Sequence, residues 1–163
     1  NLEGVAYGVT AQGAGLAAAQ ALVADLGGVV ELVPDELRPL YHAALSHAAN
    51  HLVTLVADAA DLLRRAGIED TSRVLGPMTR AALANVLAVD PATGRPADDA
   101  ALTGPVVRGD AGTVAAHLSA LQGTPAESTY KAMARRTAER AEAAGRLSHE
   151  SALAILELLA GAD

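Results

Sequence analysis

The 163-residue sequence has no cysteine, tryptophan or phenylalanine, and it has only three tyrosines. The absence of cysteine excludes disulfides, thiolate nucleophiles and cysteine-ligated zinc, and it fits a reducing compartment. The scarcity of aromatic side chains leaves nucleic-acid bases little to stack on, and alanine and leucine must fill the interior. Both residues favour helices, and small side chains let helices approach closely. The composition therefore predicts a packed helical protein.

Clustered positive charge and long apolar runs are also lacking. The formal net charge is −7, with 12 Lys and Arg against 19 Asp and Glu, and phosphate binding needs clustered positive charge. Charged residues interrupt the apolar runs before the roughly 20 residues that a bilayer requires, and the sequence shows no signal-peptide pattern. We therefore expect a cytoplasmic protein with neither a nucleic-acid nor a membrane partner.

The first part of the chain, residues 1–33, is expected to form a strand, a helix and a second strand. Residues 4–10 and 29–33 are short runs that contain β-branched side chains, and residues 14–26 are alanine-rich with leucines at helical spacing. This segment is long enough for a βαβ crossover but too small for a sheet that stands alone. Because the chain opens at Asn1 without methionine, we expect a cut through a longer protein, although a processed terminus would look the same.

Helices are predicted for the second domain, residues 34–163. The longest follows Asp35 and ends before Gly67, and at about 30 residues it far exceeds the average globular helix. Its apolar stripe and its many alanines predict burial on several sides. Further helices are expected at residues 71–88, 111–121, 125–144 and 148–160. Residues 89–109 form an irregular stretch of a length that is often functional. The sequence thus predicts a mainly α protein, a helical bundle built on one long helix.

A glycine pattern lies between the first strand and the first helix. Gly13 and Gly15 begin a G-x-G-x-x-A run, and Glu31 follows where an acidic residue of the dinucleotide fingerprint binds a ribose hydroxyl. However, this pattern arises easily in a chain rich in alanine and glycine, and residues 10–12 lengthen a turn that the fingerprint needs tight. Only helices follow the second strand. We therefore expect this chain alone to bind no nucleotide cofactor.

Polar residues recur along the long helix. His42, Ser46 and Asn50 are four residues apart and share one face. A histidine, a hydroxyl and an amide in a row can hold and protonate a carbonyl oxygen; the alternative is a polar seam that bonds to neighbouring helices or faces water. His47 and His51 have the spacing of two zinc ligands, but no third ligand is evident, so no metal site is predicted.

The segment 102–110 is the sharpest local signal in the sequence. Two glycines and a proline force a specific backbone path just before a helix that Asp110 is predicted to cap. A helix N-terminus offers free N–H groups to an anion, and Arg108 adds positive charge. The alternative is an ordinary capped loop. Thr103, Gly104 and Arg108 are therefore our candidate substrate-binding residues in this segment.

Three stretches together resemble a known family. They are Tyr41-His42-Ala43-Ala44, Ala48-Ala49-Asn50, and Leu102-Thr103-Gly104-Pro105 with Arg108-Gly109-Asp110. In order and spacing, over most of residues 4–123, they resemble a C-terminal domain catalogued as domain of unknown function, number 2520. That domain normally follows an N-terminal Rossmann domain, in proteins similar to ketopantoate reductases and pyrroline-5-carboxylate reductases. The resemblance implies a helical domain like the C-terminal domain of 6-phosphogluconate dehydrogenase.

The resemblance also implies roles for the two parts of the chain. Residues 1–33 would be the trailing strand–helix–strand of the Rossmann-type domain, whose missing part would bind NADP. The long helix would line the interdomain cleft and support a homodimer. Relatives in the wider superfamily place a lysine and an asparagine one turn apart on the equivalent helix. Here Ser46 and Asn50 stand one turn apart and no lysine is present, so His42 becomes the candidate proton donor, Asn50 the carbonyl orienter and Ser46 a substrate-binding residue.

Two functions remain open at this point. The first is the C-terminal substrate-binding and dimerisation part of an NAD(P)H-dependent reductase that acts on a small keto acid, such as ketopantoate, or on an imine. That part would not be active alone. The second is a non-catalytic helical domain that dimerises or binds a ligand. Loss of turnover when His42 is replaced would support the first function, whereas dimerisation without any ligand preference would support the second.

Overall fold

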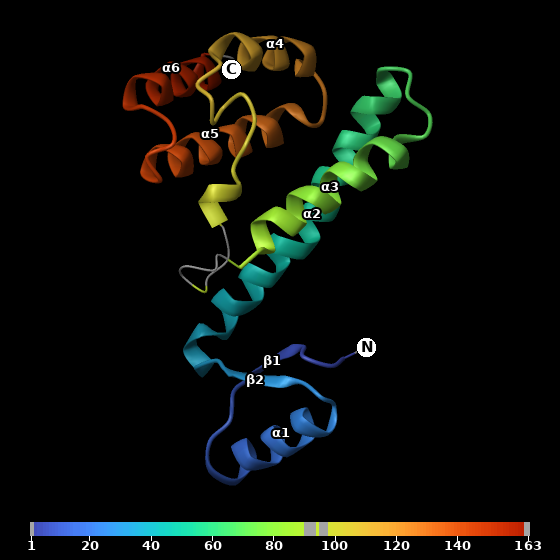
Figure 1. Cartoon of the computed structure of the whole chain (residues 1–163), viewed down its shortest axis with the longest axis vertical. Helices are drawn as coiled ribbons and strands as arrows, with labels where there is room; N and C mark the ends of the chain where they lie inside the picture. Colours follow the sequence, from blue (N-terminus) through green and yellow to red (C-terminus); the bar gives the residue numbers. More distant parts are fainter. Residues whose placement is uncertain (1, 90–93, 95–97, 162–163) are drawn as a thin grey trace. The chain divides into compact units, whose positions relative to one another are not determined.

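The computed structural model describes residues 2–89, 94 and 98–161. From the N-terminus, these residues form a strand, a helix and a second strand, and a series of helices follows (Figure 1). The predicted mainly α class, with a strand–helix–strand segment ahead of the helices, is confirmed. Part of the irregular stretch predicted at residues 89–109 lies outside the described residues.

The chain divides into two compact units, residues 1–55 and residues 56–163. The division falls within the longest helix. The domain boundary that the sequence predicts between residues 33 and 34 stays a prediction.

The first unit opens with a parallel pair of strands. β1 (Ala6–Val9) pairs residue by residue with β2 (Val29–Leu32), and α1 (Gly13–Asp25) connects the two strands and packs on both of them (Figure 1). Val23 is the buried residue of α1. The segment is therefore a small βαβ unit, as the sequence predicts, and its strands are about as short as strands in globular proteins become.

The start of α2 (Arg38–Arg65) is fastened to the strands by two contacts. The ring of Tyr41 lies so close to β1 that a Cβ atom on Gly8 would be 2.7 Å from the Tyr41 Cζ atom. Arg38 donates a hydrogen bond from Nη1 to Thr10 Oγ1 at 2.8 Å. Because Thr10 directly follows β1, the first turn of α2 is held at the carboxyl end of that strand.

The exposure of α2 corrects one prediction. The sequence predicts burial on several sides of this helix, yet none of its described residues is buried. Leu45 is 51% exposed and Val53 is 70% exposed. The periodicity of a helix shows which side is apolar, but it does not show whether the surface that covers that side belongs to the same unit of the chain. Within the described residues, Leu45 of the apolar stripe is exposed and the stripe residues between 52 and 63 are half-buried.

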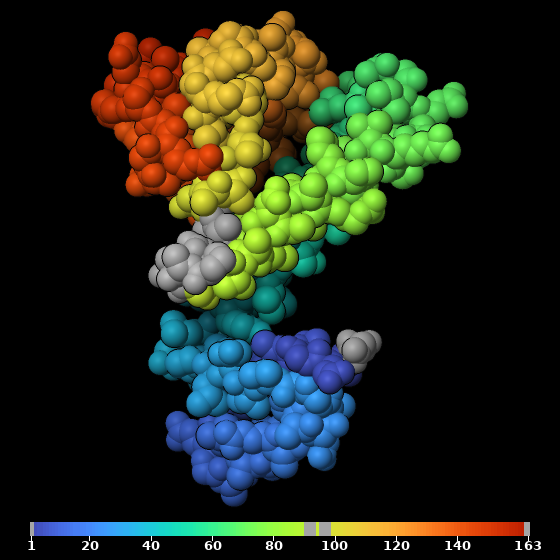
Figure 2. Space-filling model, viewed as in Figure 1, coloured from blue at the N-terminus to red at the C-terminus, as the bar shows by residue number. Residues whose placement is uncertain are grey.

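The second unit has its hydrophobic core in the last three helices. α4 (Ala111–Leu121) and α5 (Glu127–Ala143) both pack on α6 (His149–Ala160), and Figure 2 shows these amber-to-red segments as closely spaced atoms. The side chains with no exposed surface are Val114, Ala138, Ala141, Ala152 and Ile155. Small residues thus fill the interior, as the scarcity of aromatic residues predicts.

Two further elements belong to this unit. α3 (Thr71–Leu87) continues through Pro77 without a break, and it contacts the short 3-10 helix η2 (Asp98–Ala101). The Asp99 carboxylate forms an ion pair of 2.6 Å with Arg140 of α5. This pair joins η2 to the three-helix core.

Side chains cap the first turns of α4 and α6. Oδ1 of Asp110 accepts the backbone N–H of Thr113 at 3.0 Å, and Oδ2 accepts the Thr113 hydroxyl at 2.7 Å. Ser148 likewise accepts the N–H of Ser151 at 3.2 Å. The cap predicted at Asp110 is therefore confirmed. The hydrogen bonds from Thr113, helped by the positive charge of Arg108, outweigh partial desolvation and lower the pKa of Asp110.

Replacing Ile155 tests the core of α4 to α6. Ile155 has no exposed surface, so we expect Ile155→Ala to lower the free energy of unfolding by about 2–5 kcal/mol through the cavity that it leaves. Leu153→Ala is the matched control, because Leu153 lies on the same helix and is 46% exposed. Denaturant unfolding measures both variants. Equal losses in the two variants would show that the core lies elsewhere.

The cap of α4 predicts a pH dependence. Because the pKa of Asp110 is lowered on folding, its charge stabilises the folded state above the pKa of the unfolded chain, and this stabilisation is lost as the pH falls through the lowered pKa. Asp110→Asn keeps a capping oxygen but removes the charge. We expect the variant to melt at a lower temperature than the natural sequence at neutral pH, and the gap to close below the ordinary aspartate pKa of 3.8. A gap that does not change with pH in circular-dichroism melts contradicts this origin.

Candidate functional site

The polar row predicted on the long helix lies in the first half of α2. His42, Ser46 and Asn50 occupy successive turns of a continuous helix, with Ser46 half-buried and the other two exposed. Among the described residues, the three side chains have no hydrogen-bond partner. The backbone carbonyl of Asn50 accepts a hydrogen bond from Thr54 Oγ1 at 3.5 Å. An imidazole, a hydroxyl and an amide are thus all available to a ligand. Their catalytic and binding roles stay predictions.

The row begins close to the carboxyl ends of the two strands. There Thr10 donates its hydroxyl hydrogen to the Val33 carbonyl at 2.6 Å and accepts a hydrogen bond from Arg38 at 2.8 Å. A hollow of about 400 Å³ opens at this edge, and its lining comes from residues 9–12 and 32–36. Open α/β sheets bind their ligands beyond the carboxyl ends of the strands. His42 follows Arg38 by one helical turn, so the polar row starts at the edge where such ligands bind.

The first turn of α1 begins at the same edge. Gly13 is its first residue, with a φ of +54°, and Gln12 before it provides no side-chain cap. The glycine pattern therefore does lie at a helix N-terminus, as the sequence indicates. The expectation that this chain alone binds no nucleotide stays a prediction.

The histidine pair of α2 forms a contact of its own. Nδ1 of His47 lies 2.9 Å from Nδ1 of His51, and the two rings meet edge to face. This hydrogen bond needs one of the two nitrogens to donate and the other to accept. Within residues 2–89, 94 and 98–161, no group of three metal-ligating side chains is present.

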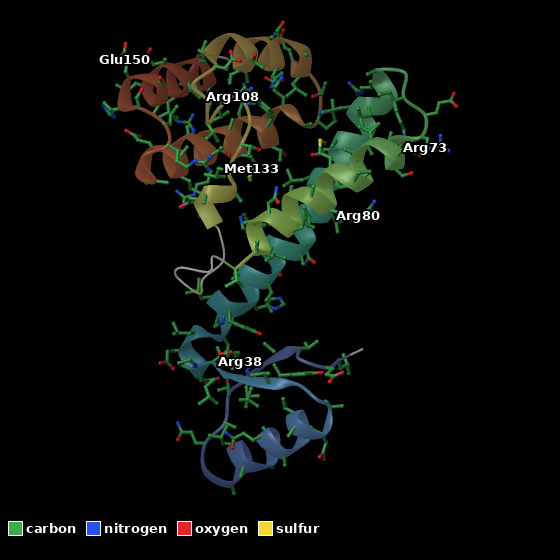
Figure 3. All side chains as sticks on the ribbon, in the orientation of Figure 1. Arg38, Arg73, Arg80, Arg108, Met133 and Glu150 are labelled. Carbon is green, nitrogen blue, oxygen red and sulfur yellow. The ribbon has the colours of Figure 1, made fainter. Side chains whose placement is uncertain are left out.

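The second set of predicted residues lies in the turn before α4. Gly104 adopts a φ of +100°, which an L side chain rarely adopts. Its carbonyl accepts the N–H of Arg108 at 3.2 Å, which closes the turn. Val106 and Val107 are buried in the helical core and anchor the turn. Arg108 is exposed at the surface of this unit (Figure 3).

The geometry of the turn bears on anion binding. Asp110 already accepts one of the free N–H groups at the start of α4, so the cap itself supplies a negative charge there. The positive charge that remains for a substrate is the Arg108 guanidinium. The structure thus gathers Thr103, Gly104 and Arg108 in one turn and His42, Ser46 and Asn50 on one helix. These two sets belong to separate compact units.

The structure also reveals a site that the sequence analysis does not predict. A hollow of about 220 Å³ lies among the turn before α4, α4 itself and α5, and Thr103 forms part of its wall. In this hollow, Nδ1 of His117 lies 2.9 Å from the Tyr130 hydroxyl oxygen, with the rings edge to face. Partial burial raises the pKa of Tyr130. The two residues lie on different helices, so no sequence spacing connects them.

Comparisons with known proteins bear on the family. The family model described as Domain of unknown function (DUF2520) matches residues 5–137. No curated protein and no solved structure matches the chain. In the part of the chain that the structure describes, no helix is both long enough and apolar enough to cross a membrane.

The match covers most of the 163 residues, including the polar row of α2, the turn before α4 and the His117–Tyr130 pair. The family that the sequence resembles is therefore confirmed, while the further resemblance to ketopantoate and pyrroline-5-carboxylate reductases stays a prediction. By this match, the chain belongs to the family described as Domain of unknown function (DUF2520).

Proposed function

We propose that this chain is the C-terminal, substrate-binding and dimerisation part of an NAD(P)H-dependent reductase that acts on a small keto acid or imine. In this proposal, a Rossmann-type domain of the same protein binds the cofactor. His42 protonates the carbonyl or imine group as hydride arrives, Asn50 orients that group, and Ser46 contributes to substrate binding. Thr103, Gly104 and Arg108 bind the carboxylate of the substrate.

The parallel strand pair is the observation that carries the proposal. Parallel sheets occur almost only where both faces are covered and several strands pair. Here the described sheet consists of β1 and β2 alone, and Val29 and Leu32 are 51% and 60% exposed. Further parallel strands would pair the open strand edges, and the helices that connect them would cover the exposed faces. A Rossmann-type domain supplies such strands.

The position of the polar row supports a role in substrate binding. A nucleotide on a completed sheet would lie beyond the carboxyl ends of its strands. The contacts of Tyr41 with Gly8 and of Arg38 with Thr10 hold the start of α2 at that edge. His42 is the residue after Tyr41, so its imidazole would lie within the region that a bound nicotinamide and its substrate share.

The exposed apolar side of α2 supports dimerisation. Leu45 is exposed and Leu52 and Val56 on the same side are half-buried, and the helix extends over 28 residues. A long helix that presents leucine, valine and alanine can bury this side against a second copy of itself, because small residues permit close packing. A homodimer formed through α2 would therefore remove apolar surface from water.

Replacing His42 tests the catalytic role. The protein to use is one that contains both the nucleotide-binding domain and this chain, assayed with NADPH against a panel of small keto acids and imines. We expect His42→Ala to lower kcat by about a hundredfold or more, because a positioned general acid contributes that much. The sedimentation of the dimer should not change.

His47→Ala is the matched control on the same helix. His47 lies on a different side of α2 from the polar row, so we expect nearly unchanged turnover. If His42→Ala also leaves turnover unchanged, His42 is not the proton donor. If no member of the panel is reduced while the protein still dimerises, a non-catalytic dimerisation or ligand-binding domain becomes the better account.

A further inference from the structure

The hollow beside His117 and Tyr130 combines polar and apolar walls. The side chains that line it come from the turn before α4, from α4 and from α5, and they are Thr103, Pro105, Val106, His117, Tyr130, Met133, Ala134 and Thr137. Figure 3 labels Met133 on α5. Every lining residue belongs to the second compact unit, so this hollow is complete without the first one.

The hydrogen bonds of the lining residues leave two donors free. Burial keeps the Tyr130 hydroxyl protonated by raising its pKa, so this hydroxyl can donate to Nδ1 of His117. Nδ1 of His117 accepts in that hydrogen bond, so the N–H that the ring can offer to a ligand is the one on Nε2. The Thr137 hydroxyl is occupied with the Met133 carbonyl at 2.8 Å. Among the side chains that line the hollow, the donors that remain for a ligand are therefore His117 Nε2–H and the Thr103 hydroxyl.

The charge and polarity of the lining identify the ligand. Although the chain has a net charge of −7, no carboxylate is among the residues that line this hollow. The Asp110 carboxylate, which interacts with His117 from outside this lining, accepts its own hydrogen bonds from Thr113. Free donors with no acid among the lining residues favour a ligand that accepts hydrogen bonds, and a carboxylate has two such oxygens. The remaining surface, from proline, valine, methionine and alanine side chains, fits a short aliphatic group.

We propose that this hollow is a binding site for a short-chain aliphatic carboxylate. His117 and Thr103 donate hydrogen bonds to the carboxylate oxygens, and Tyr130 fixes the tautomer of His117. The aliphatic chain of the ligand lies against Val106 and Met133. Since a cavity of about 150 Å³ holds a benzene molecule, a volume of about 220 Å³ accommodates a ligand of roughly nine non-hydrogen atoms.

This site goes beyond the proposed reductase function, although it shares Thr103 with the carboxylate-binding residues proposed there. It needs neither a nucleotide nor the polar row of α2, and its ligand can be measured with the present chain alone. Failure of this proposal leaves the role of His42 intact, and failure of the reductase proposal leaves this site intact.

The two methionines provide a direct test. The chain contains only Met78 and Met133; Met133 lines the hollow, whereas Met78 lies on α3 and is 60% exposed. The full chain, labelled in its methionine methyl groups, is titrated with 3-methylbutanoate and followed by NMR. We expect a saturable shift of the Met133 signal and no shift of the Met78 signal. The amine with the same carbon skeleton, 3-methylbutylamine, should shift neither signal.

Single substitutions assign the donors. We expect His117→Phe, which keeps a ring but removes its donor, to weaken binding by about tenfold or more, and Thr103→Val to weaken it by severalfold, as expected when a hydrogen bond to a charged group is lost. His149→Phe is the control, because His149 is exposed and pairs with Glu142 outside the hollow. No shift of Met133, an equal shift with the amine, or unchanged affinity in His117→Phe overturns the proposal.

Discussion

The backbone N–H and C=O groups of a parallel strand pair are the constraint on which the account of this chain depends. The backbone groups of β1 and β2 form hydrogen bonds with each other along one edge of each strand. Within the described residues, the outer edge of each strand stays unpaired. Within the described residues, α1 packs on the pair and the start of α2 contacts β1, and such small parallel sheets are not stable by themselves. The need for further strands connects the fold to the proposed function, because those strands would also form the cofactor site.

The elements of the fold follow closely from sequence patterns. Helical periodicity and end signals such as Gly67 and Asp110 predict helix boundaries within about two residues. The burial of α2 does not follow, because the apolar stripe that includes Leu45 does not indicate what covers it. By contrast, the scarcity of aromatic side chains predicts that alanine helps fill the interior, and alanines of α5 and α6 are buried in the core.

The candidate sites differ in whether their residues belong to one continuous segment of the sequence or to separate helices. His42, Ser46 and Asn50 are found by helical spacing, and Thr103 to Arg108 by glycine and proline, because both are features of one continuous segment. The pairing of His117 with Tyr130 is a tertiary contact between two helices. No periodicity encodes such a contact, so it becomes visible only when α4 and α5 are packed.

The most direct test of the central claim is a titration of this chain alone with NADPH, followed by nicotinamide fluorescence. The absence of tryptophan leaves that signal free of interference. If the cofactor site belongs to another domain, no saturable change will occur at any NADPH concentration. Saturable binding that is abolished by Gly13→Val would contradict the account, because the glycine turn before α1 would then be a cofactor site within this chain.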